Sequence, residues 1–380
     1  MADGDDGETP LDVVILAGRL GLDDDGWPLG PLLDRLEGRG IAPRVVCTER
    51  PDARRDPRIV EVPSLGRRWL KGLAVRRLFH GRTIPRPAVL HALHEETTET
   101  ALAMAETWRI PYIQTVDDFL VAEDGLRISR RWLHAFVVSS DELRDVLTDD
   151  LAVPADRVTV IPPGILVEPA PSSPPSRSGE PKVPVVGVAG PPLAETGFAI
   201  FLEAAKIVLA RGRDLEFLIA VQGGDSLEVR RHAMALRIQE RVTVADFDVV
   251  GPRLWSVLDV YCQPSLEPSA GRTLTLALVQ GVPSIAANVR GLRGLIEPGR
   301  SGLLVPPDDP ASLADAMLDL LDHPERAQDL GAAARTTLRA RFDLDAEADK
   351  LAALYRKAAE PPPSPADAGS TPSTGAPSTS

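Results

Sequence analysis

The sequence predicts an α/β protein with two doubly wound domains, because two distant stretches of the chain begin alike. Residues 11–17 and 183–189 are short runs rich in β-branched residues, and each is followed by a glycine. Such runs are typical of central strands in parallel sheets. Apolar strands then alternate with amphipathic helices in both halves. Between the halves, residues 168–181 read EPAPSSPPSRSGEP, which is the composition of a linker.

These features divide the chain into segments with different expected structures. We expect a disordered acidic tail at 1–10, a first domain at 11–167, a linker at 168–182, a second domain at 183–342, a C-terminal helix at 343–359 and a disordered Pro/Ser/Thr-rich tail at 360–380. The two tails contain too few large apolar residues to bury a core of their own.

The expected strands and helices follow the apolar pattern in order. The strands lie at 11–17, 44–47, 88–92, 112–115, 135–139 and 158–161, and then at 183–189, 216–221, 241–244, 260–263, 284–287 and 302–305. Helices fill the gaps, among them 198–211, 227–237, 310–322 and 324–341. Ligands of such folds bind at the carboxyl ends of the strands, so we expect the site in the cleft between the domains.

Composition narrows the classes of function. The chain has 380 residues with 42 basic and 55 acidic side chains, and its net charge of -13 argues against a general nucleic-acid binder. No apolar run approaches the ~18 residues of a membrane span, and the acidic start does not read as a secretory signal. Two cysteines, Cys47 and Cys262, cannot build a disulfide framework, which favours a cytoplasmic location.

A colinear series of motifs runs through the second half. It comprises Gly190 with Glu195-Thr-Gly-Phe198, Gly223-Gly224, Leu258-Asp-Val-Tyr-Cys-Gln-Pro-Ser-Leu266, Gly271-Arg-Thr-Leu274, Gly281-Val-Pro283 and Glu297-x-Gly-x-x-Gly-Leu-Leu-Val-Pro-Pro307. In order and spacing the series resembles the C-terminal domain of family-4-type glycosyltransferases, the glycosyl transferases group 1. The first half resembles the same family more loosely, at His91-Ala-Leu-His94, Thr115-Val-Asp117 and Ile161-Pro-Pro-Gly164.

The resemblance implies the GT-B fold, in which two Rossmann-like domains face a cleft and the C-terminal helix crosses back to the first domain. It implies transfer of a sugar from a nucleotide-diphosphate sugar to a glycan or lipid acceptor, with no metal ion and no cofactor beyond that substrate. His91 and His94 would then lie in the cleft of the first domain.

The charged positions of the family's donor site differ in this chain. The arginine and lysine that stabilise the leaving diphosphate align with Pro191 and Thr196, and two glutamates align with Pro268 and Leu276. The family's histidine in the Thr-x-His segment aligns with Asp117. Losing two cations from such a site would slow transfer on the order of 10⁴-fold unless other groups compensate.

Three arginines could compensate, namely Arg272, Arg290 and Arg293, and the alternative is that they are solvated surface residues. The expected helix after Gly197 offers its N-terminus to a phosphate, or is a plain helix start. The donor-binding candidates are therefore Gly190, Glu195, Thr196, Gly197, Gly271, Arg272, Thr273, Arg290 and Arg293. The candidates for a catalytic carboxylate are Asp117 and Glu267, the latter one residue before an aligned glutamate position.

Two functional hypotheses follow. The chain is either an active transferase with a rebuilt donor site, or a catalytically inactive relative that binds a glycan, a lipid or a partner protein. An unrelated GT-B enzyme such as a sugar-nucleotide epimerase fits the motifs of the second half less well.

Weaker motifs point to ordinary structure. The two histidines of His91-Ala-Leu-His94-Glu95 lack the helical spacing of a zinc site, so no metal is expected. Asp23-Asp-Asp25 fits a solvated turn. Residues 67–80 are basic and amphipathic, which fits either a surface helix on the first sheet or a peripheral membrane contact.

Overall fold

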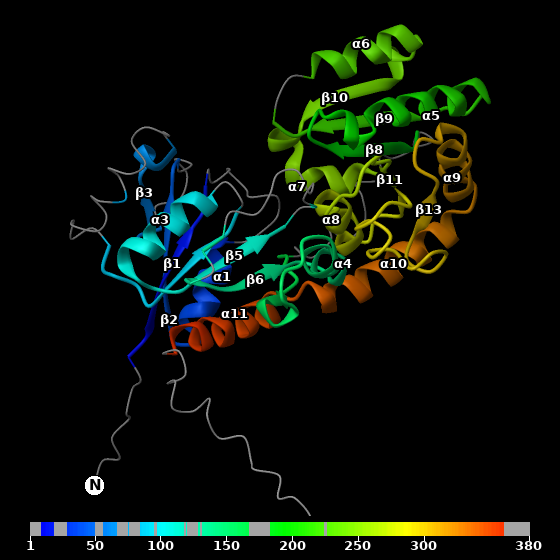
Figure 1. The fold of residues 1–380 in the computed structure, drawn as a ribbon. Helices are drawn as coiled ribbons and strands as arrows, with labels where there is room; N and C mark the ends of the chain where they lie inside the picture. The colour runs from blue at the N-terminus through cyan, green and yellow to red at the C-terminus, as the bar shows by residue number, and fades with distance from the viewer. Residues whose placement is uncertain are drawn as a thin grey trace, which may run out of the picture.

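Two parallel β-sheets, each packed between helices, form the body of the computed structural model (Figure 1). The structure describes residues 9–18, 29–49, 56–66, 75, 84–94, 97–117, 119, 128–129, 131–166, 183–223 and 226–360, without the side chains of 248 and 252. The expected linker, the Asp23–Asp25 turn, nearly all of both tails and all of 67–80 except Val75 lie outside these residues and stay predictions.

The first sheet has seven parallel strands in the order β3-β2-β1-β4-β5-β6-β7. They are β1 (Leu11–Leu16), β2 (Ile41–Cys47), β3 (Ile59–Glu61), β4 (Val89–Ala92), β5 (Tyr112–Val116), β6 (Leu133–Val138) and β7 (Val158–Val160). Helices α3 (Thr98–Trp108) and α4 (Asp141–Asp145) pack on one face, and α1 (Leu29–Glu37) and α11 (Leu344–Ala359) on the other. Both faces are covered because these strands are apolar on both sides.

The second sheet has six parallel strands in the order β10-β9-β8-β11-β12-β13. They are β8 (Val185–Gly190), β9 (Glu216–Val221), β10 (Val242–Asp246), β11 (Val260–Gln263), β12 (Ser284–Ala287) and β13 (Leu303–Val305). Helices α5 (Phe198–Ala210), α6 (Leu227–Leu236) and α9 (Pro310–Asp322) cover one face, and α7 (Phe247–Val257) and α8 (Arg272–Gln280) cover the other. Helix α10 (Pro324–Arg341) contributes buried residues to the cores on both faces.

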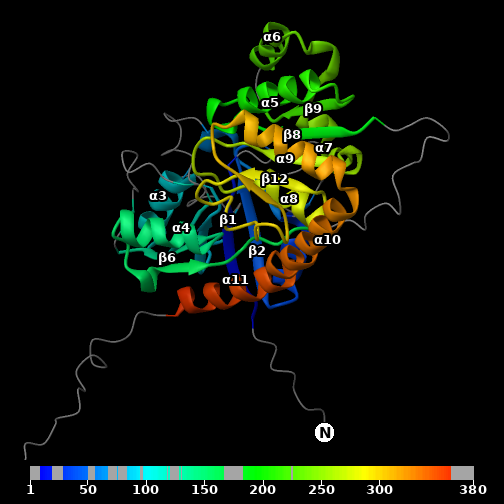
Figure 2. The same ribbon diagram turned by 90° about the vertical axis from the view of Figure 1, so that its right-hand side faces the viewer.

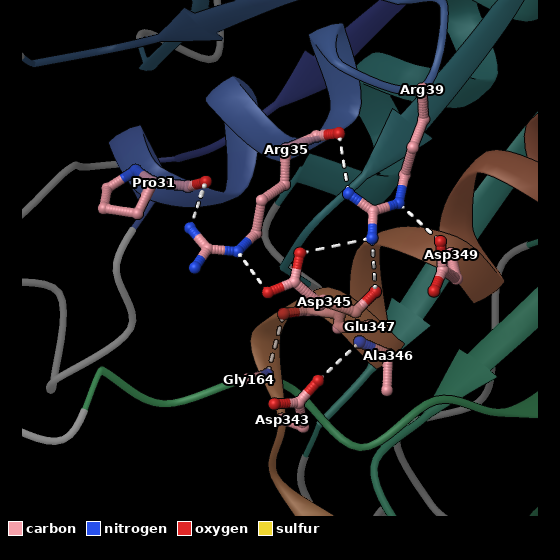
Figure 3. Close-up of polar contacts among 9 residues, drawn as sticks. All are labelled: Pro31, Arg35, Arg39, Gly164, Asp343, Asp345, Ala346, Glu347 and Asp349. Carbon is pink, nitrogen blue, oxygen red and sulfur yellow. Dashed lines mark hydrogen bonds and ion pairs between the residues drawn. The ribbon is translucent and has the colours of Figure 1, made fainter.

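Helix α11 carries the chain from the second domain back to the first. It follows α10 directly and lies along the first domain in both views (Figures 1 and 2). The Asp343 carboxylate caps it by accepting the Ala346 N–H at 2.8 Å. On its solvent side, Asp345 and Asp349 pair with Arg39 of the segment after α1 (Figure 3). The two doubly wound domains and the returning helix confirm the expected GT-B fold.

The strand order reverses between β1 and β4 in the first sheet, and between β8 and β11 in the second. Such a reversal opens a crevice at the carboxyl ends of the strands, where α/β folds bind ligands. All of the expected strands are present to within two or three residues at their ends. Strand β3 was not anticipated, because its three residues carry too little pattern to be seen in a sequence.

Candidate functional site

A pocket of about 380 Å³ lies between the two domains, at the carboxyl edge of the first sheet. His91, Thr115, Ser139 and Ile161 line it from the ends of four neighbouring strands. Arg272 at the start of α8 closes it from the second domain. The pocket therefore lies where the topology places ligands.

His91 is buried at the floor of the pocket and both of its ring nitrogens are occupied. Nδ1 lies 2.7 Å from the Tyr355 hydroxyl of α11, and Nε2 lies 2.7 Å from Thr115 Oγ1. Burial, with a smaller contribution from the charge of His94, lowers the pKa of His91 to about 3. His91 is thus a neutral side chain that joins β4, β5 and α11.

His94, Asp117 and Arg272 form a cluster of ionisable side chains in the wall of the pocket. The Asp117 carboxylate is in an ion pair with Arg272 from the other domain, and His94 Nδ1 lies 3.5 Å from the same carboxylate. Burial alone would raise the pKa of Asp117, but the hydrogen bond from His94 and the charge of Arg272 outweigh it and hold the pKa below its usual value. Asp117 is therefore a carboxylate at neutral pH.

The other two candidate arginines lie outside the pocket and bind acids of the first domain. Arg290 Nη1 lies 3.1 Å from Asp150, and Arg293 Nε lies 3.2 Å from Glu142. The Glu142 carboxylate also accepts the backbone N–H of Gly291. Both arginine side chains are about half exposed, so in this arrangement they bridge the domains.

The loop after β8 keeps a tight shape without a cationic side chain. Gly197 begins α5 at a φ of 80°, and a Cβ there would lie 1.9 Å from the carbonyl oxygen of Pro264. The Thr196 hydroxyl is buried and donates to the Pro191 carbonyl at 2.7 Å. Because that hydroxyl is used within the loop, it is not free to donate to a ligand in this arrangement.

The remaining donor-side candidates are structural or exposed. Thr273 donates to Gln263 Oε1 at 2.8 Å, and Gly271 begins α8 at a φ of 68° beneath Leu292 and Leu295. Glu195 and Glu267 are exposed, and neither lines the pocket. Of the predicted site residues, the pocket thus gathers His91, His94, Asp117 and Arg272.

Sequence reasoning missed Glu347, which faces the pocket from α11. Its Oε2 accepts the backbone N–H of Gly164 at 2.7 Å (Figure 3). Burial raises the pKa of Glu347 to about 7, although the Gly164 hydrogen bond opposes the shift. A signal was present, because Glu347 lies three residues after Leu344 and four before Leu351, on the apolar stripe of the helix.

Two findings concern the described residues as a group. Among them, no three His, Cys, Asp or Glu side chains gather in a way that could hold a metal ion. The helices found in those ranges are all too short or too polar to cross a membrane.

Comparison with known proteins places both halves in one family. Residues 32–168 match the model of Glycosyltransferase Family 4, and residues 181–323 match that of Glycosyl transferases group 1. An α-D-kanosaminyltransferase of Streptomyces kanamyceticus is 32% identical over 176 residues, which are 46% of each chain. A D-inositol 3-phosphate glycosyltransferase of Paenarthrobacter aurescens is 28% identical over 307 residues, 73% of this chain and 74% of that one. The chain thus spans less than half of the first of these relatives.

Solved structures share the fold at low sequence identity. Anabaena HepE in complex with UDP and glucose has a TM-score of 0.73 at 16% identity, covering 91% of this chain and 100% of that one. Sucrose-phosphate synthase of Thermosynechococcus elongatus has a TM-score of 0.72 at 19% identity, covering 91% and 98%. The two family models, the motif order and the shared GT-B fold together show that this chain belongs to the family-4-type glycosyltransferases.

Proposed function

We propose that the chain transfers a sugar from a nucleotide-diphosphate sugar to an acceptor held in the pocket, without a metal ion and with Arg272 as the cation of an altered donor site. The observation that carries the proposal is the position of Arg272, which lies in the first turn of α8 and faces the pocket. The solved relatives include HepE in complexes with UDP and with UDP-glucose. A nucleotide sugar is therefore the donor class to test first.

The proposed chemistry assigns one role to each side chain of the cluster of His94, Asp117 and Arg272. As the bond from the sugar to the diphosphate breaks, negative charge grows on the leaving phosphate, and the Arg272 guanidinium stabilises it. The acceptor oxygen bonds to the sugar carbon, and its proton passes to the Asp117 carboxylate, which His94 orients. Arg272 must exchange Asp117 for the diphosphate when the donor binds, so the two anions compete for it.

The test is calorimetry with UDP, GDP, ADP and their sugar derivatives. We expect one nucleotide sugar to bind with micromolar affinity, and Arg272→Ala to weaken it tenfold or more, about 1.4 kcal/mol per factor of ten. Arg290→Ala is the matched control, because this arginine pairs with Asp150 and neither of the two residues lines the pocket. Asp117→Asn should tighten donor binding while transfer is lost. No binding up to millimolar concentration by folded protein contradicts the proposal.

A second candidate is a catalytically inactive relative that binds a glycan, a lipid or a partner protein in the same fold. The loop of residues 190–197 favours it, since it holds no lysine or arginine and the Thr196 hydroxyl is already bonded to Pro191. Release of free nucleotide from a bound donor sugar separates the two candidates. An active transferase produces it with an acceptor present, whereas an inactive relative produces none.

A further inference from the structure

One part of the pocket wall holds a carboxyl group among apolar side chains, and the proposed sugar transfer assigns no role to that group. Away from Asp117 and Arg272, the wall is built from apolar side chains of α1, the end of β7 and α11, namely Leu29, Leu32, Val160, Ile161, Leu344 and Leu351. Glu347 stands between the last two of these, on the same helix face. A single carboxyl group therefore sits in an apolar wall.

Helix geometry separates Glu347 from its acidic neighbours. Asp345 and Asp349 are four residues apart and share the helix face on which Arg39 forms ion pairs. Glu347 is two residues from each of them, about 200° around the helix, and points toward Gly164 (Figure 3). The cations of the α1 region thus neutralise the acids on one side of α11 and do not reach the carboxyl group on the other.

The other ionisable side chains discussed for the pocket already have ion-pair or hydrogen-bond partners within the described residues. Asp117 pairs with Arg272, Asp141 with Arg144 and Glu142 with Arg293. Arg341 donates to the Gly294 carbonyl at 2.9 Å, and both nitrogens of His91 are bonded. Within the same residues the one hydrogen bond of Glu347 comes from the Gly164 N–H.

An ionised carboxylate in this position lowers the stability of the fold unless another group pairs with it. Apolar surroundings disfavour its ionised form, and one backbone N–H offsets only part of that cost. The group that offsets the rest most strongly is a cation that donates a hydrogen bond. Neighbouring leucines in turn favour a ligand whose remaining surface is apolar.

We propose that this part of the pocket binds a protonated amine carried on an apolar body, with Glu347 as the carboxylate that pairs with the ammonium group. The proposal rests on the proposed function in one respect only, namely that such a molecule is the acceptor of the sugar. It depends on neither nucleotide binding nor turnover, so the two can fail separately. Glu347 would then select an acceptor that carries an amine.

The experiment compares phenethylamine with 2-phenylethanol, which share a body and differ in the charged group. At pH 8 we expect calorimetry to give a dissociation constant at least about tenfold smaller for the amine. Glu347→Gln should abolish this preference while leaving binding of the alcohol unchanged. Asp349→Asn, a matched carboxyl-to-amide change outside the pocket on the same helix, should preserve it.

A second readout distinguishes pairing from a merely structural role. Because the amine favours ionised Glu347, binding at pH 7 should release about half a proton, seen as a dependence of the binding heat on the ionisation enthalpy of the buffer. The release should be absent in Glu347→Gln. Equal binding of amine and alcohol, or an amine preference that survives in Glu347→Gln, would overturn the proposal.

Discussion

The carboxyl edges of the two sheets face each other across the interdomain region, yet they carry different chemistry. On the second domain, the loop from Gly190 to Gly197 is shaped by close backbone contacts and bears no cation. On the first domain, His94 and Asp117 form an ionic cluster with Arg272, and Glu347 adds a carboxyl group below it. The comparison teaches that loop shape and site charge are separate properties, because close glycine contacts fix the shape of a loop that carries no lysine or arginine.

The largest expected effect tests the shape of the loop from Gly190 to Gly197, at the carboxyl edge of the second sheet. In Gly197→Ala the new Cβ would meet the Pro264 carbonyl oxygen at 1.9 Å, on a backbone with a φ of 80°. We expect the free energy of unfolding to fall by about 3–4 kcal/mol in urea denaturation. Gly212→Ala is the control, because its φ is 79° and nothing lies within 4 Å. Gly212→Ala should lower the free energy of unfolding by about 1 kcal/mol. Equal losses in Gly197→Ala and Gly212→Ala would show that the contact with the Pro264 carbonyl is unimportant.

The next largest effect concerns the ionisation of Glu347, beside the carboxyl edge of the first sheet. The pKa of Glu347 is about 7 in the folded protein and about 4.3 in the unfolded chain. The native state therefore binds more protons between these values, and the contribution of Glu347 to stability is lost as the pH rises through 7. Glu347→Gln, which keeps an acceptor for the Gly164 N–H, should be more stable than the parent by about 1–2 kcal/mol at pH 8.

The same difference should vanish near pH 4, where the carboxyl group is protonated and resembles the amide. Urea denaturation of the parent and of Glu347→Gln at both pH values measures this difference in the free energy of unfolding. Asp349→Asn lies on the same helix outside the pocket and should show no such step between pH 5 and 7. A constant difference between parent and Glu347→Gln at all pH values would contradict a raised pKa of the Glu347 carboxyl group.

The smallest effect concerns the ion pairs that bridge the domains. Arg290 and Asp150 are 43% and 52% exposed, so water and salt screen their attraction. A double-mutant cycle with alanine at both positions should give a coupling below about 0.5 kcal/mol. The same cycle on Arg272 and Asp117, which are 33% and 22% exposed, should give a larger coupling. Equal couplings would mean that the pocket does not strengthen the Arg272 pair.

Much of the fold could be predicted because its signals are local. The apolar run of 183–189 is a strand in any compact structure, and β8 forms there. Likewise α9 and α10 begin at Pro310 and Pro324, where a proline opens a helix without losing a hydrogen bond. The placement of Arg272 in the pocket follows from Gly271, which begins α8 at the edge of the second sheet.

The candidate site could be predicted only in part, because its pairs join residues far apart in the chain. Arg290 and Arg293 were candidates for binding phosphate, and in the folded protein they contact Asp150 and Glu142 of the first domain. His91 was expected at the cleft and lines the pocket, where Tyr355 of α11 and Thr115 of β5 occupy both nitrogens of its ring. No periodicity in the sequence indicates which acid an arginine will meet.

The sequence by itself determined the two parallel sheets and the family, since strand patterns and motif spacing are properties of neighbouring residues. Tertiary structure decided which charged side chains pair with one another and, within the part of the chain that the structure describes, which carboxyl group stays without a cation in the pocket. It brought Asp117 to Arg272 across the domains, and it placed Glu347 beside Gly164, 183 residues away. The pKa of a carboxyl group depends on burial and on charges within a few ångströms, and those distances exist only once the domains have packed together.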